Sequence, residues 1–573
     1  MTKIGTSVAL ALSLTCITTL QADEKCEVKY KDHVLHYADE DNEQTPKNHL
    51  ITIDYKNMKL LAKKELDGTL NHHADPMGFV STANYMLLIP KGSNFVSVYE
   101  IKSGKFIKKI RLPFRPRSAD AYNPKKNLVL LNSRDRPAAV LLDPVKLKIV
   151  GIAGFNIKCD QNKPNPYSIK ELAGDENIFD LNYRCHAPDF GGDQISGHPI
   201  WISSDAFAIL DRANRKIEVY KISKDDDVWN TKLIQVIDTD TSMHQLIPKN
   251  KKKNVKNRVY YGSTEGNIAE GKKAGVYKFV RHGDYLKKVA FTPLEYDDIN
   301  GYQGHNLYIT PDLKDIYAPS GTFINSEGDS LNSGGVFILD ADSMEVEKAI
   351  KTGKGAGHVA FSKEYKTAIV TNHKDEYITA IDYENQEFIK NIPLDFPHAN
   401  IASLYQSHMQ HVSEDGRYYY NFWTDGGVFF RVDLDSLEVD KSIEVDGQPI
   451  QGNFYDHIAI NCDLPKPSKS DGYDRFFSND NPYSEWKGYQ YFFSKKFIKQ
   501  YLSNKPKKPN FRDYDNILLY YCDYFAYYRD LMLYYANRTH SKWLKKYYTQ
   551  ISKRYDELSK YYLNLYNNEN KDD

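Results

Sequence analysis

The sequence has 573 residues, more than one ordinary domain needs, although a single large β architecture can absorb several hundred. Lys and Arg together number 76, as do Asp and Glu, so the formal net charge is zero. A chain without a net field is a poor candidate for binding nucleic acid or an anionic membrane surface.

The N-terminal residues 1–22 predict a secretory signal peptide. Lys3 precedes a short apolar run, and small and polar residues follow it up to Ala22. This run is too short to cross a bilayer, and no later stretch reaches 18 apolar residues, so we expect no membrane span. The sequence therefore predicts a periplasmic or secreted protein, with the polar residues 23–48 as an exposed lead-in.

Residues 49–464 predict an all-β region built from one repeated unit. Short alternating strands separated by Gly, Asn, Asp and Ser turns recur every roughly 40–55 residues, about four strands to a unit, which is typical of a β-propeller. The units run over 73–110, 117–150, 197–222, 244–289, 304–350, 357–392 and 408–443. We predict a seven-bladed propeller, or an eight-bladed one if the strands at 51–66 and 448–460 form a blade of their own.

The composition changes beyond the propeller. Residues 465–488 indicate a linker, and residues 489–573 are rich in Tyr and Lys. Apolar and aromatic residues recur there at three- and four-residue spacing, which predicts a small α-helical module. Its tyrosines favour core packing or a protein-binding face.

Five cysteines remain after the signal peptide, in a compartment that permits disulfides. Cys159 with Cys185 and Cys26 with Cys462 are reasonable pairs, which leaves Cys522 odd; the alternative is that several stay unpaired. No Cys-x-x-Cys-His motif occurs, which excludes a covalent c-type haem.

Histidines recur at the start of the predicted units. The first strand of every propeller blade lines the central channel, so residues at that position converge on one axis. Neutral imidazole binds copper, zinc, nickel and iron, and such sites bind copper most tightly among the first-row divalent metals. The pattern predicts an axial copper centre, with Met243 and Met409 as thioether ligands or core residues. Its predicted ligands are His72, His73, His198, His244, His305, His358 and His411.

The other histidines differ from this set in their position within the repeated unit. His408 and His411 lie three apart on one strand and should face opposite sides. We expect His411 to reach the axis, because its distance from the following turn matches the other units. Packing or surface roles are expected for His33, His36, His49, His282, His457 and His540, while His186, His373 and His398 are left unassigned.

The order of the histidines resembles the propeller domain of nitrous oxide reductase. The adjacent pair His72-His73 opens the first unit and single histidines head later ones, over roughly residues 49–460. The resemblance implies that the seven predicted ligands hold a multinuclear copper–sulfide cluster. In that family a histidine heads an early blade, whereas the unit at 117–150 begins without one. The match of this sequence to the family's ligand set is therefore weakest at His198. The strand pattern also resembles haem d1 propellers and YVTN repeats, which implies one or two of these histidines as axial ligands.

Three functions are compatible with these features. The first is an exported copper-binding propeller, either a nitrous-oxide-reductase-like oxidoreductase acting on a small substrate or a carrier of metal. Since the cupredoxin-like domain of that family is absent from the sequence, catalysis implies a separate electron-donor protein. The alternatives are a haem d1-type propeller and a non-enzymatic periplasmic scaffold for protein partners. No catalytic residue is assigned, because no Gly-x-Ser-x-Gly, Walker, dinucleotide or His-Glu-x-x-His motif occurs.

Overall fold

The computed structural model describes residues 30–40, 49–65, 76–82, 85–90, 95–100, 105–155, 185, 187–189, 194–250, 258–398, 405–445, 448–459, 466–477, 509, 517–538 and 542–569. The predicted signal peptide, 1–22, lies outside these residues. The chain divides into two compact units, Met1–Ser478 and Asn479–Asp573.

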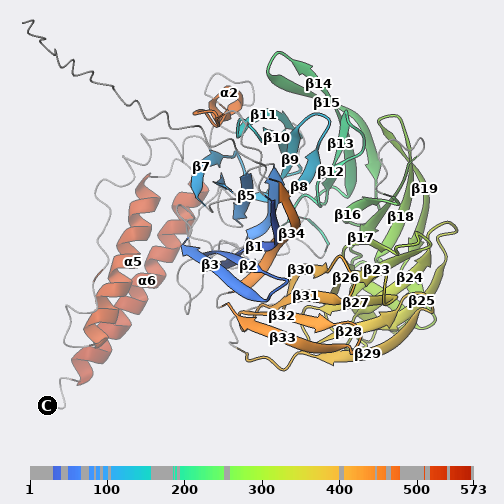
Figure 1. The fold of residues 1–573 in the computed structure, drawn as a ribbon. Helices are drawn as coiled ribbons and strands as arrows, with labels where there is room; N and C mark the ends of the chain where they lie inside the picture. The colour runs from blue at the N-terminus through green and yellow to red at the C-terminus, as the bar shows by residue number, and fades with distance from the viewer. Residues whose placement is uncertain are drawn as a thin grey trace, which may run out of the picture. The chain divides into compact units, whose positions relative to one another are not determined.

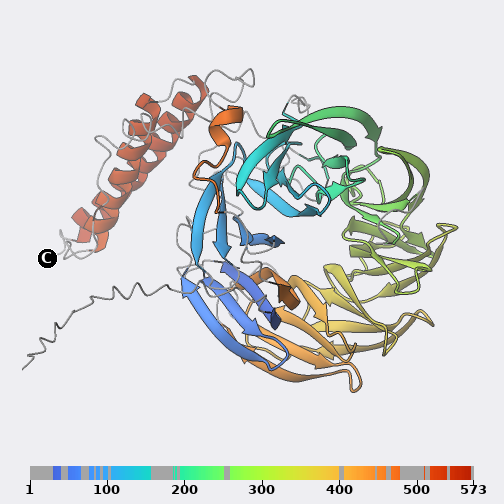
Figure 2. The same cartoon turned by 45° about the horizontal axis from the view of Figure 1, so that its top comes forward.

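The first unit is a β-propeller (Figures 1 and 2). Its described strands form seven sheets, one of which consists of two blades joined by a parallel bridge between Gly151 and Trp229. The described part of the chain therefore contains eight blades, and the eight-bladed alternative is correct.

Blade 1 contains β1 (Tyr30–Glu40), β2 (His49–Asp54), β3 (Lys59–Glu65) and β34 (Gln448–Ala459); blade 2 contains β4 (Pro76–Thr82), β5 (Tyr85–Pro90), β6 (Phe95–Glu100) and β7 (Phe106–Arg111); blade 3 contains β8 (Pro116–Asn123), β9 (Leu128–Ser133), β10 (Ala139–Asp143) and β11 (Lys148–Ala153); blade 4 contains β12 (Ile200–Trp201), β13 (Ala206–Asp211), β14 (Lys216–Asp225) and β15 (Val228–Asp238). Blade 5 contains β16 (Met243–Pro248), β17 (Val259–Thr264), β18 (Gly275–His282) and β19 (Tyr285–Pro293); blade 6 contains β20 (Glu295–Tyr296), β21 (Ile299–Gly304), β22 (Tyr308–Ile309), β23 (Asp315–Ile324), β24 (Gly335–Asp340) and β25 (Val346–Lys351); blade 7 contains β26 (Ala356–Ser362), β27 (Thr367–Asn372), β28 (Tyr377–Asp382) and β29 (Glu387–Pro393); blade 8 contains β30 (Gln406–Val412), β31 (Tyr418–Trp423), β32 (Val428–Asp433) and β33 (Glu438–Glu444).

Blade 1 joins the two ends of the propeller sequence. Its strand order is β3-β2-β1-β34, so the chain's early strands pair with a strand that follows blade 8. The antiparallel pairing of β1 with β34 runs from Tyr30 opposite Ala459 to Glu40 opposite Gln448. This corrects the expectation that 23–48 is a mere lead-in, because β1 is hydrogen-bonded on both sides. The polar composition of residues 23–48 gave no sign of this strand, which is held by backbone hydrogen bonds to its two neighbours.

The core lies in layers between neighbouring blades. The middle strands β9, β13 and β27 are buried along their whole length because blades cover both of their faces. One hydrophobic cluster packs Ile53 of blade 1 against Phe422 of blade 8 and Met86 of blade 2. Outer strands such as β33 are largely exposed. Burial is therefore greatest at the middle strands, whereas inner strands such as β16 and β30 are buried in part.

A short strap follows β34 and packs on the outside of the propeller. It contains helix α2 (Tyr473–Phe477). Arg111 bonds the Asp471 carboxylate with its Nε at 2.7 Å, and the Ile149 amide donates to the Asp471 carbonyl at 2.9 Å. The described part of the predicted linker 465–488 is thus docked on blades 2 and 3, because Asp471 supplies both a charge partner and a backbone acceptor.

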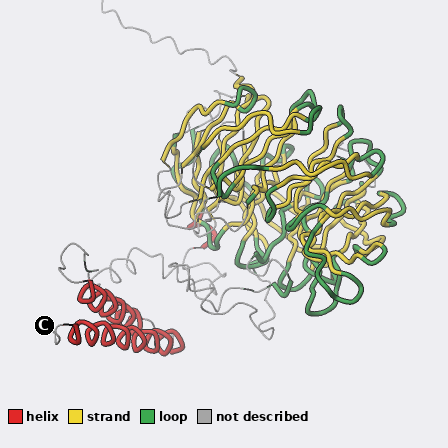
Figure 3. Tube along the Cα trace, turned by 90° about the horizontal axis from the view of Figure 1, so that it is seen from below, coloured by secondary structure: helices red, strands yellow, loops and turns green. Residues whose placement is uncertain are grey.

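The second unit contains the helices α5 (Ile517–Arg538) and α6 (Lys542–Glu569), which pack against each other (Figure 3). Tyr521 and Tyr562 are one of several ring pairs between them, with centroids 5.3 Å apart. The predicted helical module is confirmed, and its protein-binding role stays a prediction. None of the described helices is long and apolar enough to span a membrane.

The described cysteines agree with part of the predicted pairing. Cys185 is disulfide-bonded, and Cys522 is a buried free thiol. Cys159, Cys26 and Cys462 lie outside the described residues, so the partners of the predicted pairs stay predictions.

Truncating Phe454 should weaken the closure of the ring. This residue of β34 is half-buried, and its ring lies 5.3 Å from that of Tyr55 in blade 1 and 4.7 Å from that of His411 in blade 8. We expect Phe454→Ala to lower the free energy of unfolding by about 2–3 kcal/mol, somewhat less than for a fully buried Phe. Urea unfolding followed by near-UV circular dichroism measures this. Phe388→Ala, at a 51% exposed position of β29, is the matched control and should cost less than about 0.5 kcal/mol; equal losses would contradict the role of β34.

Candidate metal centre

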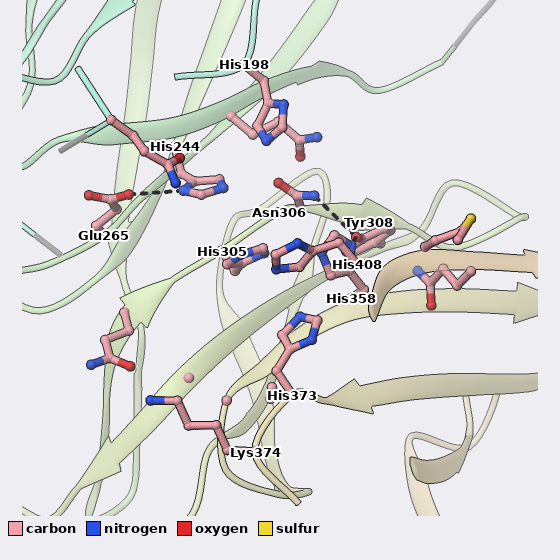
Figure 4. Close-up of a pocket in the computed structure, with 18 of the residues that line it drawn as sticks. His198, His244, Glu265, His305, Asn306, Tyr308, His358, His373, Lys374 and His408 are labelled. Atoms are coloured by element: carbon pink, nitrogen blue, oxygen red, sulfur yellow. Dashed lines mark hydrogen bonds and ion pairs between the residues drawn. The ribbon is translucent and has the colours of Figure 1, made fainter. Parts of the chain in front are cut away.

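A cavity of about 670 Å³ lies where the inner strands of the blades converge (Figure 4). Seven imidazoles line it, and six of them form a set in which neighbouring ring centroids lie 4.5–5.3 Å apart. We refer to them as the histidine cluster: His198, His244, His305, His358, His373 and His408. The predicted convergence of histidines from successive blades therefore occurs in the structure.

β-Bulges in the inner strands aim side chains at this cavity. In β16, Met243 pairs with Thr264 and Gln245 with Ser263, which makes His244 the extra residue. Arg117 is the corresponding extra residue in β8, and Gly357 the one in β26 just before His358. In blade 6 the inner strand is interrupted between β21 and β22, and His305 lies in the interruption. Bulges re-aim side chains in this way at many functional sites.

His408, and not the predicted His411, belongs to the histidine cluster. Two extra residues lie in β30 between Gln406 and Gln410, and this irregularity turns His408 towards His305 and His358. His411 borders the cavity, but its ring stacks on that of Phe454 at 4.7 Å. Regular alternation would place only one of the two histidines at the axis, but the strand is not regular at this point and both border the cavity, so His411 as a metal ligand stays a prediction.

The other sequence expectations for this site have mixed outcomes. His72 and His73 lie outside the described residues. His373, which was left unassigned, joins the cluster because it follows β27 directly and faces the same cavity. Met243 and Met409 are buried members of hydrophobic clusters between blades, and Met409 also lines the cavity, so the thioether role stays a prediction. The sequence signal for His373 was only its place at the end of a buried strand.

Four rings of the histidine cluster are fixed by a partner on Nδ1. His244 is bonded to the Glu265 carboxylate at 3.0 Å, and His305 to the Gly357 carbonyl at 3.1 Å. His358 is bonded to the Tyr308 hydroxyl at 2.6 Å, and His373 to the Gln406 carbonyl at 2.9 Å. Metal-binding histidines typically have such a partner on the nitrogen that does not bind the ion. The Nε2 atoms of His358 and His373 are buried and have no hydrogen-bond partner among the described residues. In these two rings Nε2 is therefore available to bind an ion in the cavity.

Five imidazoles of the cluster have a lowered pKa, which favours their neutral form. Burial lowers the pKa of His373 to about 3 and that of His408 to about 4. It also lowers the pKa values of His244, His305 and His358 well below their usual range, with neighbouring imidazoles adding to the effect. A neutral ring has a free lone pair on one nitrogen, which is the form that binds metals.

Two glycines allow these rings to approach each other. A Cβ on Gly357 would lie 2.5 Å from Nε2 of His373, and a Cβ on Gly304 would lie 2.1 Å from the Thr264 carbonyl oxygen. Contacts this short do not occur between non-bonded atoms in folded proteins, so a side chain at Gly304 would push blade 5 away and one at Gly357 would displace the His373 ring of the same blade. The Gly-His order at the start of these units is therefore a packing requirement of the site.

His305, His358 and His408 form the closest group. One nitrogen from each ring lies within 4.8 Å of the other two. An ion bonded at about 2.0–2.1 Å to three imidazoles holds their nitrogens roughly 3.3–3.6 Å apart, so a contraction of little more than about 1 Å would suffice. Within the described chain, this is the one group of three or more His, Cys, Asp or Glu side chains that could hold an ion.

A buried ion pair supports one side of the cluster. Arg212 pairs with Glu265, and both side chains are at most 1% exposed. Glu265 also accepts from His244 Nδ1, as Figure 4 shows, so this carboxylate fixes the ring through a pair that is itself held in place.

Glu265→Gln should destabilise the propeller, because Arg212 would remain buried without its charge partner. We expect a loss of about 3–5 kcal/mol in the free energy of unfolding, measured by urea denaturation. The control is Glu270→Gln, which breaks the partly exposed pair with Arg215 and should cost no more than about 1 kcal/mol. A small effect of both changes would show that the Arg212 charge is compensated elsewhere.

Comparisons with known proteins show similarity to solved propeller structures but assign no family. No family model matches the sequence, and no curated protein matches it. The chain is similar to the solved structure of the dihydro-heme d1 dehydrogenase NirN in complex with DHE, at 15% identity and a TM-score of 0.49, over 76% of this chain and 78% of that one. It is also similar to apo AztD from Citrobacter koseri (11% identity, TM-score 0.39, 75% of this chain and 99% of that one) and to BamB from Moraxella catarrhalis (10% identity, TM-score 0.41, 66% and 90%). At these identities the likeness concerns the propeller alone.

Proposed function

We propose that this chain is an exported copper-binding propeller that holds copper through His305, His358 and His408. The observation that carries the proposal is the convergence of one nitrogen from each of these three imidazoles within 4.8 Å in the axial cavity. His373 and His244 lie directly beside them, with ring centroids 4.6 Å from His408 and 4.5 Å from His305, and can bind a second ion or complete the first site.

Copper is favoured by the chemistry of the donors. The group offers neutral nitrogen ligands and no carboxylate, which disfavours magnesium and calcium. Among the first-row divalent ions, nitrogen sites bind copper most tightly. Export, which the N-terminal residues predict, removes the chain from the metal pools of the cytosol. Zinc is the main competitor, because it also binds imidazole in tetrahedral sites.

Metal analysis of the purified exported protein tests the proposal directly. We expect at least one copper per chain by inductively coupled plasma mass spectrometry, in excess over zinc, iron and nickel. A porphyrin band in the visible spectrum would instead identify the haem d1-type alternative. A protein that contains no metal and takes up neither Cu(I) nor Cu(II) would leave the scaffold alternative.

A single-turnover measurement distinguishes a reductase from a metal carrier. The copper-loaded protein would be reduced with dithionite and exposed to nitrous oxide. Reoxidation coupled to the formation of dinitrogen would support the oxidoreductase reading, in which a separate protein donates the electrons. A stable reduced form would support storage or delivery.

Substitution of the three ligands should abolish tight binding. We expect His305→Gln, His358→Gln and His408→Gln each to weaken Cu(I) affinity by at least about 100-fold, since loss of a supporting residue alone costs about 10–100-fold. Competition with bathocuproine disulfonate measures this. His411→Gln is the matched control, because it borders the same cavity but packs on Phe454, and should change affinity less than about threefold. A large loss in His411→Gln with none in His408→Gln would reverse the assignment.

Gly357→Ala tests the close packing of the site without removing a ligand. Its Cβ would displace His373, whose Nε2 lies 2.5 Å away, and shift His358 beside it. We expect Cu(I) affinity to fall by about 10–100-fold, the range seen when a residue that holds a ligand in place is lost. Gly321→Ala is the control in the same cavity, since its Cβ would meet only the Gln303 side chain, at 3.0 Å. Unchanged binding in Gly357→Ala would show that the rings do not act together.

A further inference from the structure

His358 differs from the other fixed rings of the histidine cluster in the group that holds its Nδ1. The partners of His244, His305 and His373 are a carboxylate and two backbone carbonyls, which accept hydrogen bonds and cannot donate them. In these three rings Nδ1 therefore carries the proton and Nε2 the lone pair. The partner of His358 is the Tyr308 hydroxyl at 2.6 Å, which can donate or accept. The tautomer of His358 therefore depends on where the hydroxyl proton of Tyr308 points.

The neighbours of the Tyr308 oxygen direct this proton to His358. Nδ2 of Asn306 donates to the oxygen at 3.5 Å, as Figure 4 shows, and the backbone amide of Val359 is a second donor. Of these three groups in the described chain, only Nδ1 of His358 can accept the hydroxyl proton. Nε2 of His358 has no protein partner, but in this arrangement it carries the ring proton. A protonated ring nitrogen has no lone pair to offer an ion.

Two buried polar atoms of this group have no partner among the described residues, namely Nε2 of His358 and Oδ1 of Asn306. Leaving a buried polar atom without a partner is costly. Half a turn of the Asn306 amide would exchange Oδ1 with Nδ2 and present an acceptor to the Tyr308 hydroxyl. The Tyr308 oxygen could then accept from Nδ1 of His358, and Nε2 would have a lone pair for an ion. The rearrangement thus gives both atoms a partner in one step.

We propose that Asn306 and Tyr308 set the tautomer of His358 and so decide whether this ring can act as a metal ligand. This names the regulation of the proposed copper site and rests on the proposed function for the metal-bound form. In the metal-free protein Tyr308 donates to Nδ1 of His358. In the metal-bound protein Tyr308 accepts from Nδ1 and donates to Oδ1 of Asn306. The ring keeps one proton throughout, because Nε2 releases a proton to water and Nδ1 takes one up from water. Asn306 and Tyr308 are positioning residues, since neither has to touch the ion.

The tautomer can be read by NMR on the full-length protein. Long-range proton–nitrogen spectra of protein with isotope-labelled histidines show which ring nitrogen carries the proton, and His358→Gln identifies the signals of His358. We expect the proton on Nε2 in the metal-free wild type and on Nδ1 after addition of Cu(I), a diamagnetic ion. Metal-free wild type with the proton on Nδ1 of His358 would overturn the proposal. This measurement needs no change at Asn306 or Tyr308.

A double-mutant cycle tests whether Asn306 acts through Tyr308. Asn306→Leu removes the acceptor that the Tyr308 hydroxyl needs in the metal-bound form, so we expect Cu(I) affinity to fall about tenfold in competition with bathocuproine disulfonate. In the Tyr308→Phe background the same change should alter affinity less than about twofold, because no hydroxyl proton then needs an acceptor. Equal losses in both backgrounds would mean that Asn306 acts by packing alone, which contradicts the proposal. Asn306 makes a single hydrogen bond, at 3.5 Å, so Asn306→Leu should fold.

Two results separate this proposal from that of the copper site. A protein that takes up no copper but has the proton on Nε2 of His358 would support the hydrogen-bond arrangement and refute the copper proposal. Copper uptake by a protein whose His358 already carries the proton on Nδ1 would refute only the role of Asn306 and Tyr308.

Discussion

The pairing of β1 with β34 is the interaction on which the rest of the structure depends. A propeller blade buries both faces against its neighbours, so an open ring would leave two apolar faces in water. Blade 1 avoids this by combining three strands from the start of the propeller with one from its end. Closure also brings Phe454 against His411 and borders the cavity with the innermost strand. The axial site is therefore a property of the closed ring and of no single blade.

Within that ring, irregular backbone decides which side chains reach the axis. Regular strands would alternate their side chains between the two faces of a blade, towards the cores between blades. An extra residue breaks this alternation and turns one side chain inward, as at Arg117, His244 and His408. Each bulge interrupts the hydrogen-bond ladder of its blade and turns one side chain towards the axis. Side chains from different blades therefore converge there, an arrangement that no single sheet could provide.

The fold could be predicted from the sequence because each blade contains its own local signal of alternating strands and polar turns. The histidine cluster could be predicted only in part. His198, His244, His305 and His358 lie near Gly or at unit starts, where phase alone places them inward. His408 also opens its unit, but the two-residue bulge changes its distance from the following turn and so favoured His411, and the chain bend after β27 that places His373 has no distinct composition. The strand at 30–40 was missed because pairing through the backbone requires no apolar side chains.

The electrostatic character of the cavity follows from the burial of neutral donors. Burial lowers the pKa of imidazoles such as those of His305 and His358, since the charged form is costly to desolvate. A set of neutral nitrogens can bind a soft or borderline cation, but it leaves the charge of that cation uncompensated. A carboxylate ligand would remove this charge at the cost of favouring harder ions, and the one carboxylate on the described lining is already engaged by Arg212.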